Sequence, residues 1–172
     1  MRRLFCFISM ILLAAFAARA SHRMAIAELY DARGNNVGIA TFVESHDGVR
    51  IAVNLHDMPE GTHALHIHAA GACEKPGFKT AKGHFNPFDR RHGLKSPRGA
   101  HAGDLLNIVI GKDGTGAALV TAPLVTLGEG KNSLFQGPGT AIMIHDGPDD
   151  YVSDPAGAAG PRIACGVIRA LD

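Results

Sequence analysis

Residues 49–68 read VRIAVNLHDMPEGTHALHIH, two stretches of alternating side chains separated by turn-forming residues. Alternation with a period of two is typical of β-strands. We therefore predict strands at Val49–Leu55 and Thr62–His68, with a turn at Met58–Gly61 between them. The proline and glycine of that turn favour a chain reversal.

The second of these strands carries three histidines. Residues two apart in a strand face the same way, so His66 and His68 point to one side, opposite Leu65 and Ile67. The apolar pair belongs in a core, which leaves the two imidazoles outside it, beneath a loop. His63 has the other parity, and we interpret it as a packing or hydrogen-bonding histidine.

Short alternating stretches continue along the rest of the chain, and no long segment has the helical period. Eight short strands with turn residues between them indicate an all-β fold, an eight-stranded antiparallel Greek-key β-sandwich or flattened barrel. The predicted strands are Met24–Asp31, Val37–Val43, Val49–Leu55, Thr62–His68, Asp104–Ile110, Gly116–Thr121, Gly139–His145 and Ile163–Ala170.

Two connections, Ala69–Gly103 and Asp146–Pro161, are unusually long. Loops of this length without secondary structure are uncommon in a compact domain unless they are functional. Both carry residues that bind metals well, and the first carries a cysteine. We therefore expect the strands to be the scaffold and the two loops to form the active region.

Six histidines and one aspartate between Leu65 and Asp146 form a candidate ligand set for two metals. Imidazoles with one carboxylate are ligands that zinc and copper favour. Within the set, three histidines and the aspartate would fill a closed tetrahedral zinc site of the structural kind. Scattered loop residues are the alternative interpretation. The set is His66, His68, His84, His92, His101, Asp104 and His145.

The first twenty residues have the features of a cleaved secretory signal. Arg2 and Arg3 precede a mostly apolar stretch that is short for a membrane span, and Ala18-Arg19-Ala20 has the small-x-small form of a cleavage site. We predict cleavage after Ala20, a mature domain at 21–172 and a periplasmic location. A retained membrane anchor is the alternative.

Without residues 1–20 the chain loses three arginines, so Lys+Arg falls from 17 to 14 against 16 acidic residues, a formal net charge of −2. This argues against nucleic acid as a partner, and no membrane contact is expected after signal removal. Two cysteines remain, Cys73 and Cys165. An even pair in an exported protein favours one disulfide, with two free thiols as the alternative.

In its motifs the chain resembles the bacterial copper/zinc superoxide dismutases. The matching segments occur in the family's order and span most of residues 21–172. The resemblance implies the β-sandwich fold and dismutation of superoxide to oxygen and hydrogen peroxide. The segments are His63-Ala-Leu-His66-Ile-His68, Gly71-Ala-Cys73, Gly83-His84-Phe-Asn-Pro87, His92-Gly93, His101-Ala-Gly-Asp104-Leu, Ile144-His145, Asp149-Asp150 and Gly160-Pro-Arg162-Ile-Ala-Cys165-Gly-Val-Ile168.

The resemblance also implies one copper and one zinc per chain, with His84 bridging them. Asp149 corresponds to the family's aspartate that links a copper ligand to a zinc ligand, His66 to His92. The neighbouring Asp150 is better interpreted as part of a solvated turn. The implied copper ligands are His66, His68, His84 and His145, and the implied zinc ligands are His84, His92, His101 and Asp104.

Three further roles follow from the resemblance. Cys73 and Cys165 correspond to the disulfide that joins the metal loop to the last strand. Arg162 corresponds to the arginine beside the copper, where its fixed charge and fork of donors suit a small anion. A salt bridge or a backbone clamp is its structural alternative. His84 corresponds to the imidazole that takes up a proton when it leaves reduced copper and then delivers it.

Some positions depart from the family pattern. Ala64 stands where a glycine is usual, and Ala158 where an asparagine is common. The loop at 146–161 lacks lysine, so we expect any steering of superoxide to come from the lysines of the other loop, Lys75, Lys79 and Lys82. None of these differences touches an expected ligand.

Two other classes of protein remain open from the sequence. A copper-delivery protein would favour sulfur ligands for Cu(I), whereas the only methionine beside a ligand is Met143. A sandwich that binds zinc alone and has no activity would not need His66, His68, His145 and Arg162. Metal analysis with a dismutase assay separates these classes. A homodimer is also left open.

Overall fold

The computed structural model describes residues 23–171, so the expected signal segment at 1–20 lies outside the described part. Within that part, the structure has no helix that is both long and apolar enough to cross a membrane. The chain is nearly all β, as expected. Its elements are β1 (Met24–Asp31), β2 (Asn36–Ser45), β3 (Gly48–Leu55), β4 (Gly61–His63), β5 (Leu65–His68), the short 3₁₀ turn η1 (Lys79–Ala81), β6 (Ile108–Ile110), β7 (Gly116–Ala122), β8 (Ala141–His145), β9 (Arg162–Val167) and β10 (Arg169–Leu171).

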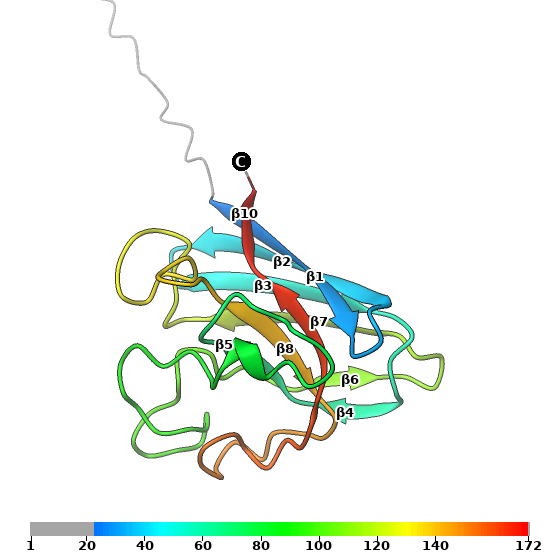
Figure 1. The fold of residues 1–172 in the computed structure, drawn as a ribbon. Coiled ribbons are helices and arrows are strands. Elements are labelled where there is room, and N and C mark those ends of the chain that lie inside the picture. Colours follow the sequence, from blue (N-terminus) through cyan, green and yellow to red (C-terminus); the bar gives the residue numbers. More distant parts are fainter. Residues whose placement is uncertain (1–22, 172) are drawn as a thin grey trace, which may run out of the picture.

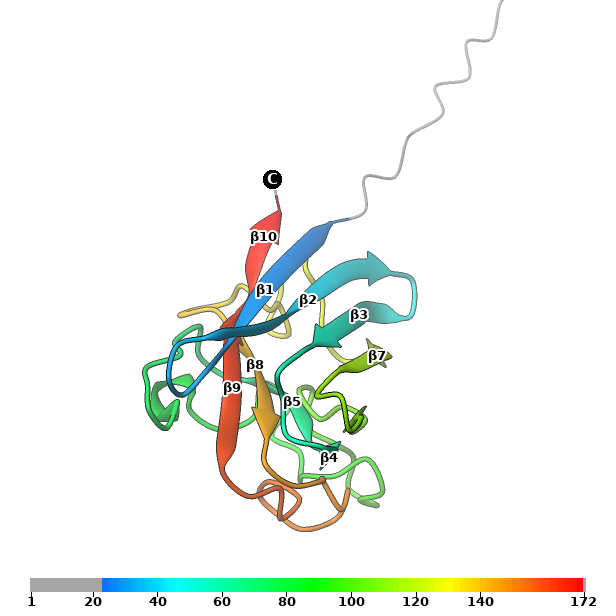
Figure 2. The same cartoon turned by 90° about the vertical axis from the view of Figure 1, so that its right-hand side faces the viewer.

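Eight of the strands form one antiparallel sheet with the order β5-β8-β9-β1-β2-β3-β7, and β10 pairs with β1 beside this path. The other two strands, β4 and β6, form a separate pair. The large sheet curls into a half-barrel (Figures 1 and 2). The two long loops lie together at the lower end in both views, away from the C-terminus.

Two of the predicted strands are each divided in two. Thr62–His68 breaks at Ala64, because β4 pairs with β6 whereas β5 pairs with β8. At the break, Ala64 donates its N–H to Gly147 and accepts one from His145. The last predicted strand breaks at Ile168, whose N–H donates to Thr140 outside the sheet.

Two predicted strands are shorter than expected, and that predicted at Gly139–His145 begins only at Ala141. Only Ile108–Ile110 of the stretch predicted to begin at Asp104 is a strand. Asp104 instead forms an isolated bridge with His66. A further long connection, between β7 and β8, was not singled out by the sequence. Glu44 fastens it by accepting hydrogen bonds from the Thr126 hydroxyl and the Leu127 N–H.

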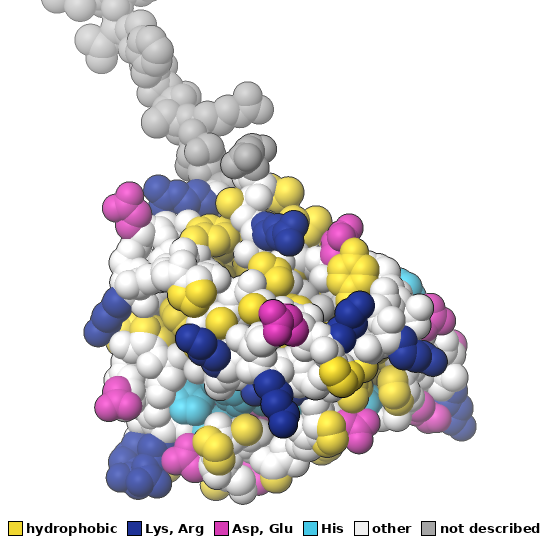
Figure 3. Space-filling model, in the orientation of Figure 1, with side chains coloured by type: hydrophobic (Ala, Val, Ile, Leu, Met, Phe, Trp, Pro, Cys, Tyr) yellow, Lys and Arg dark blue, Asp and Glu magenta, His cyan; other side chains and the backbone are white. Residues whose placement is uncertain are grey.

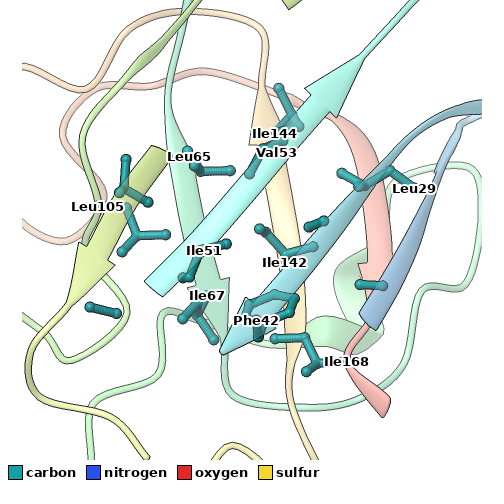
Figure 4. Close-up of a cluster of buried hydrophobic side chains, with 14 of the residues drawn as sticks. Leu29, Phe42, Ile51, Val53, Leu65, Ile67, Leu105, Ile142, Ile144 and Ile168 are labelled. Atoms are coloured by element: carbon teal, nitrogen blue, oxygen red, sulfur yellow. The ribbon is translucent and has the colours of Figure 1, made fainter. Parts of the chain in front are cut away.

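The core consists of the alternate residues that the sequence pattern assigns to it. In β3 every second residue is buried, and Leu65 and Ile67 of β5 are fully buried. Figure 4 shows side chains of β3 and β5 in one cluster with Phe42 of the neighbouring strand β2 and Ile142 of the neighbouring strand β8. Burial of each such side chain contributes about 1.5–3 kcal/mol. The core therefore fixes the strands from which the loops extend.

A disulfide joins Cys73 in the first long loop to Cys165 in β9, with 5.7 Å between the Cα atoms. Cys165 is fully buried and lies in a small second apolar cluster with Phe78, Ala81, Ala141 and Met143. The expected pairing is thus confirmed. The bond fastens the loop against the outer face of β8 and β9.

We predict that Cys73→Ser lowers the free energy of unfolding by about 4–5 kcal/mol, because the bond closes a loop of 92 residues and the chain-entropy cost rises with loop length. Denaturant unfolding of the oxidised proteins measures this. In excess reductant the two proteins should unfold alike. A difference that persists in reductant would assign the loss to the side chain rather than to the cross-link.

Candidate metal centre

The site forms where the two long loops fold over the outer face of β5. His66 and His68 are both buried there, as their parity predicts. Two isolated bridges, His66↔Asp104 and His68↔His84, bring the first loop alongside the strand. Backbone hydrogen bonds between Ile67 and the residues Phe85 and Gly103 hold it in place.

Four histidines that are far apart in the sequence form the first ligand group. One ring nitrogen from each lies within 4.8 Å of those of the others. The Nε2 atoms of His145 and His68, for example, are 3.5 Å apart. The first group consists of His66, His68, His84 and His145.

Three histidines and one aspartate form the second ligand group beside it. The carboxylate oxygen Oδ1 of Asp104 lies 2.9 Å from Nδ1 of His84, 3.1 Å from Nδ1 of His92 and 3.3 Å from Nδ1 of His101. At such short distances, protons or a cation must lie between these atoms. The second group consists of His84, His92, His101 and Asp104.

His84 belongs to both groups, through different ring nitrogens. Its Nδ1 faces Asp104, whereas its Nε2 is buried and has no hydrogen-bond partner within the described residues. Among the side chains of residues 23–171, the Nδ1 atom of His66 is the other buried polar atom without a hydrogen-bond partner. A buried polar atom almost always has a partner. Both residues belong to the first group, where a bound metal would satisfy these two atoms.

Fixed acceptors select the tautomers of the other histidines of the first group. The Nδ1–H of His68 donates to the Lys82 carbonyl at 2.8 Å, and that of His145 donates to the Gly160 carbonyl at 3.1 Å. Because a neutral imidazole has one donor and one acceptor nitrogen, each Nε2 keeps its lone pair. These lone pairs face the first group.

Asp149 connects the two groups through hydrogen bonds with one histidine of each. Its Oδ2 accepts a hydrogen bond from Nε2 of His66 at 2.8 Å, and its Oδ1 accepts one from Nε2 of His92 at 3.0 Å. The side chains of all three residues are fully buried. The neighbouring Asp150 is exposed and accepts hydrogen bonds from Val152 and Ser153, as expected for a turn.

Asp104 is held in its orientation by backbone donors. The N–H groups of Gly93 and His101 donate to its Oδ2 at 2.8 and 3.0 Å, which leaves Oδ1 for the three imidazoles. Burial alone would raise the pKa of Asp104, but the hydrogen bonds with the rings of His101, His84 and His92, followed by that of the Gly93 N–H, hold it well below its usual range. The hydrogen bonds from His66 and His92 likewise outweigh burial and lower the pKa of Asp149.

The pKa values of the buried histidines are shifted in two opposite directions. Burial lowers the pKa of His68 to about 2 and those of His84 and His145 to about 4, so these rings are neutral at pH 7 and able to bind a cation. Burial acts in the same direction on His92, but hydrogen bonds with Asp104 and Asp149 raise its pKa to about 9. A cation at this position would replace a proton.

Arg162 is anchored beside the first group by backbone carbonyls. Its guanidinium donates to Phe78 O at 2.7 Å and to Lys82 O at 2.5 Å. The Lys82 carbonyl also accepts the hydrogen bond from His68, so one backbone group holds both side chains. Figure 3 shows histidine side chains at the surface of this face, with lysine or arginine side chains next to them.

His63 takes no part in either group. Its Nδ1 lies 2.8 Å from the His145 carbonyl, and its Nε2 lies 3.0 Å from the Pro59 carbonyl. It is therefore a hydrogen-bonding histidine, as expected. Sequence reasoning missed the Lys82 carbonyl and Asn107, whose side chain binds the backbone of Asp149. No local pattern marks either residue, because their partners are distant in sequence.

The chain is also similar in sequence to known proteins. The family model described as copper/zinc superoxide dismutase (SODC) matches residues 36–168. "Superoxide dismutase [Cu-Zn] 2" of Aquifex aeolicus is 52% identical over 145 residues, which cover 83% of this chain and 85% of that protein.

Solved structures of related proteins are also similar to this one. A double mutant of a SOD-like protein from Bacillus subtilis superposes with a TM-score of 0.79 at 38% identity, over 82% of this chain and 94% of that one. The Cu/Zn superoxide dismutase from Brucella abortus gives a TM-score of 0.69 at 31% identity, over 85% and 99%. The resemblance noted in the sequence is confirmed: the chain belongs to the copper/zinc superoxide dismutase family.

Proposed function

We propose that this chain dismutates superoxide to oxygen and hydrogen peroxide at a copper centre next to a zinc site. Membership of the family supports superoxide as the substrate and an oxidoreductase activity. The observation that carries the proposal for this chain is the placement of His84, whose two ring nitrogens face two different ligand groups. A single imidazole so placed suits two neighbouring metals.

We assign copper to the first group and zinc to the second, one of each per chain. Four neutral imidazoles suit copper. The unpartnered nitrogens of His66 and His84 fit a metal bound among them. Three histidines with one carboxylate fill a tetrahedral zinc site with no open position, so the zinc would be structural. Asp104, oriented by two backbone donors, would be the anionic ligand.

When bound, copper supplies one-electron chemistry, accepting an electron from one superoxide and giving it to a second. The protein's own residues supply charge and protons. Arg162 uses two of its guanidinium donors on backbone carbonyls, which fixes the group and leaves other donors for a small anion. His84 is placed to hold a proton at Nε2, the atom that points into the first group, and to give it up to the product.

We also infer that residues 1–20 form a signal peptide cleaved after Ala20 and that residues 21–172 act in the periplasm. The charged start, the short apolar stretch and the small-x-small site support export. The disulfide is consistent with an oxidising compartment. The role would be antioxidant defence outside the cytoplasm, with superoxide as the partner and with no nucleic acid or membrane involved. A homodimer is compatible with this role.

The first prediction concerns metal content. Purified mature protein loaded with both metals should contain one copper and one zinc per chain and should dismutate superoxide. Elemental analysis and a dismutase assay on the same sample measure this. Zinc alone after copper loading would favour an inactive zinc-binding sandwich. Both metals without activity would favour a copper-delivery protein.

The second prediction is that Asp149→Asn weakens retention of both metals without removing a ligand. One carboxylate oxygen would become an amide donor facing an imidazole N–H, so either His66 or His92 loses its acceptor. Loss of such a supporting partner typically lowers metal affinity on the order of 10–100-fold. Chelator competition measures the change, and Asp150→Asn, in the exposed turn, is the matched control.

The third prediction is that metal-replete Arg162→Ala reacts with superoxide more slowly, and Arg162→Glu more slowly still. The mature chain carries no net positive charge, so attraction must come from a few local charges. The wild-type rate should fall with added salt, since screening acts over about 8 Å near physiological ionic strength, and this salt effect should be smaller in Arg162→Ala. Stopped-flow kinetics measure both effects.

Arg50→Ala, at an exposed arginine on β3, is the control for Arg162→Ala. Its rate and salt dependence should match the wild type. Metal content is measured for each variant, because loss of copper would imitate the effect. If metal-replete Arg162→Ala keeps the wild-type rate and salt dependence, Arg162 serves only as a clamp for the Phe78 and Lys82 carbonyls.

A further inference from the structure

Asn107 binds both backbone polar groups of Asp149. Its amide Nδ2 donates to the Asp149 carbonyl at 3.0 Å, and its Oδ1 accepts the Asp149 N–H at 3.0 Å. The pairing imitates one rung of an antiparallel ladder, with a side chain in place of a strand. The backbone N–H of Asn107 in turn donates to the Tyr151 hydroxyl at 2.9 Å. One residue therefore holds two neighbouring positions of the second long loop.

The position of Asn107 itself is fixed by the β4–β6 pair and by the core. It directly precedes β6, and Ile108, the next residue, and Leu105, two residues before it, are buried in the main core. Ile108 pairs with His63 in β4. A side chain that leaves the backbone at such a point has little freedom to move. Asn107 therefore fixes the second long loop, which lacks regular structure, relative to the β4–β6 pair.

The backbone of Asp149 must be held in place because its two carboxylate oxygens accept hydrogen bonds from two different histidines. One oxygen serves His66 of the first group, and the other serves His92 of the second. A shift of its backbone would lengthen at least one of these hydrogen bonds. The loop also packs tightly there, since a Cβ on Gly157 would lie 1.8 Å from Oδ1 of Asp149. The carboxylate cannot adjust in that direction.

Apart from the hydrogen bond between His66 of β5 and the carboxylate, the other contacts that hold the loop do not reach Asp149. Lys95 donates its N–H to the Tyr151 carbonyl, and Gly147 accepts one from Ala64. The nearest internal contact is the Tyr151 N–H, which donates to Oδ1 of Asp149 at 2.6 Å. Tyr151 is itself bound to Asn107 through its hydroxyl. Besides its hydrogen bonds with the rings of His66 and His92, Asp149 is therefore held by Asn107 directly and by Asn107 through Tyr151.

We propose that Asn107 is a positioning residue for both metal sites, acting through Asp149 on the rings of His66 and His92. This inference rests on the proposed metal binding and goes beyond it, since Asn107 contacts neither ligand group. The competing explanation is that Asn107 only stabilises the loop. In that case, metal retention would change no more than the loss of stability requires.

Two variants separate the explanations. Asn107→Ala removes both hydrogen bonds to Asp149. Asn107→Asp keeps the acceptor for the Asp149 N–H but places an oxygen against the Asp149 carbonyl, so only one bond is lost and the shape is kept. Asn132→Ala is the matched control, because Asn132 donates a comparable hydrogen bond to the Leu124 carbonyl in the connection between β7 and β8.

The probes are zinc, cobalt(II) in place of zinc, and copper(II). Zinc transfer to a chromophoric chelator should be faster in both Asn107 variants, on the order of 10-fold or more, as for loss of a partner that orients a ligand. The cobalt(II) visible bands and the copper(II) EPR spectrum should change, because the rings of His92 and His66 are no longer fixed. Asn132→Ala should behave as the wild type in all three measurements.

Thermal unfolding of the same proteins shows how much stability each variant loses. Should Asn107→Ala fold too poorly to be measured, Asn107→Asp alone decides. The inference is overturned if the Asn107 variants keep the wild-type spectra and lose zinc no faster than Asn132→Ala. If the wild type itself takes up neither cobalt nor copper at these sites, the proposed function fails instead, and the two failures are thereby distinguished.

Discussion

The site depends on hydrogen bonds that fix one ring nitrogen of each buried histidine. A neutral imidazole offers one donor and one lone pair, so an acceptor on one side determines what the other side presents. Asp149 fixes His66, the Lys82 carbonyl fixes His68 and the Gly160 carbonyl fixes His145. None of these acceptors lies in a strand. The orientation of rings that stand on or beside the sheet is therefore determined by loops, which must be as well ordered as the sheet itself.

Such order comes from a small number of strong constraints rather than from secondary structure. The disulfide fastens the first loop to β9, and within that loop the Lys82 carbonyl reaches both His68 and Arg162. The second loop is fastened where Asn107 binds Asp149. Each constraint replaces many weak contacts, since an unstructured segment otherwise keeps about 1–2 kcal/mol of conformational entropy per residue. A long loop can thus hold ligands with the accuracy that a metal requires.

The extent to which the sequence predicts this structure follows from the range of the interactions. Alternation within β5 is local, so the burial of Leu65 and Ile67 in the core was predicted correctly, and the histidines of the candidate site were recognisable by type and spacing. The break at Ala64 was not predictable, because β4 and β5 differ only in their distant partners, β6 and β8. Asn107 was missed for the same reason. Its side chain forms two hydrogen bonds with a residue 42 positions away, and the sequence around Asn107 has no pattern that predicts them.

The apolar core and the polar site are parts of one constraint, because β5 contributes to both. Its two faces alternate between buried leucine or isoleucine and buried histidine, so a shift of one residue in register would put imidazoles into the core and isoleucine into the site. The pairing with β8 sets Ile67 opposite Ile142 and Leu65 opposite Ile144, and His66 opposite Met143 on the other face. Packing of the aliphatic pairs thereby selects the register that gathers the histidines. On its other edge β8 pairs with β9, and there His145 at the end of β8 lies opposite Arg162 at the start of β9. The hydrophobic effect is non-directional. By selecting the register of β5, it nevertheless determines where the histidine side chains come together.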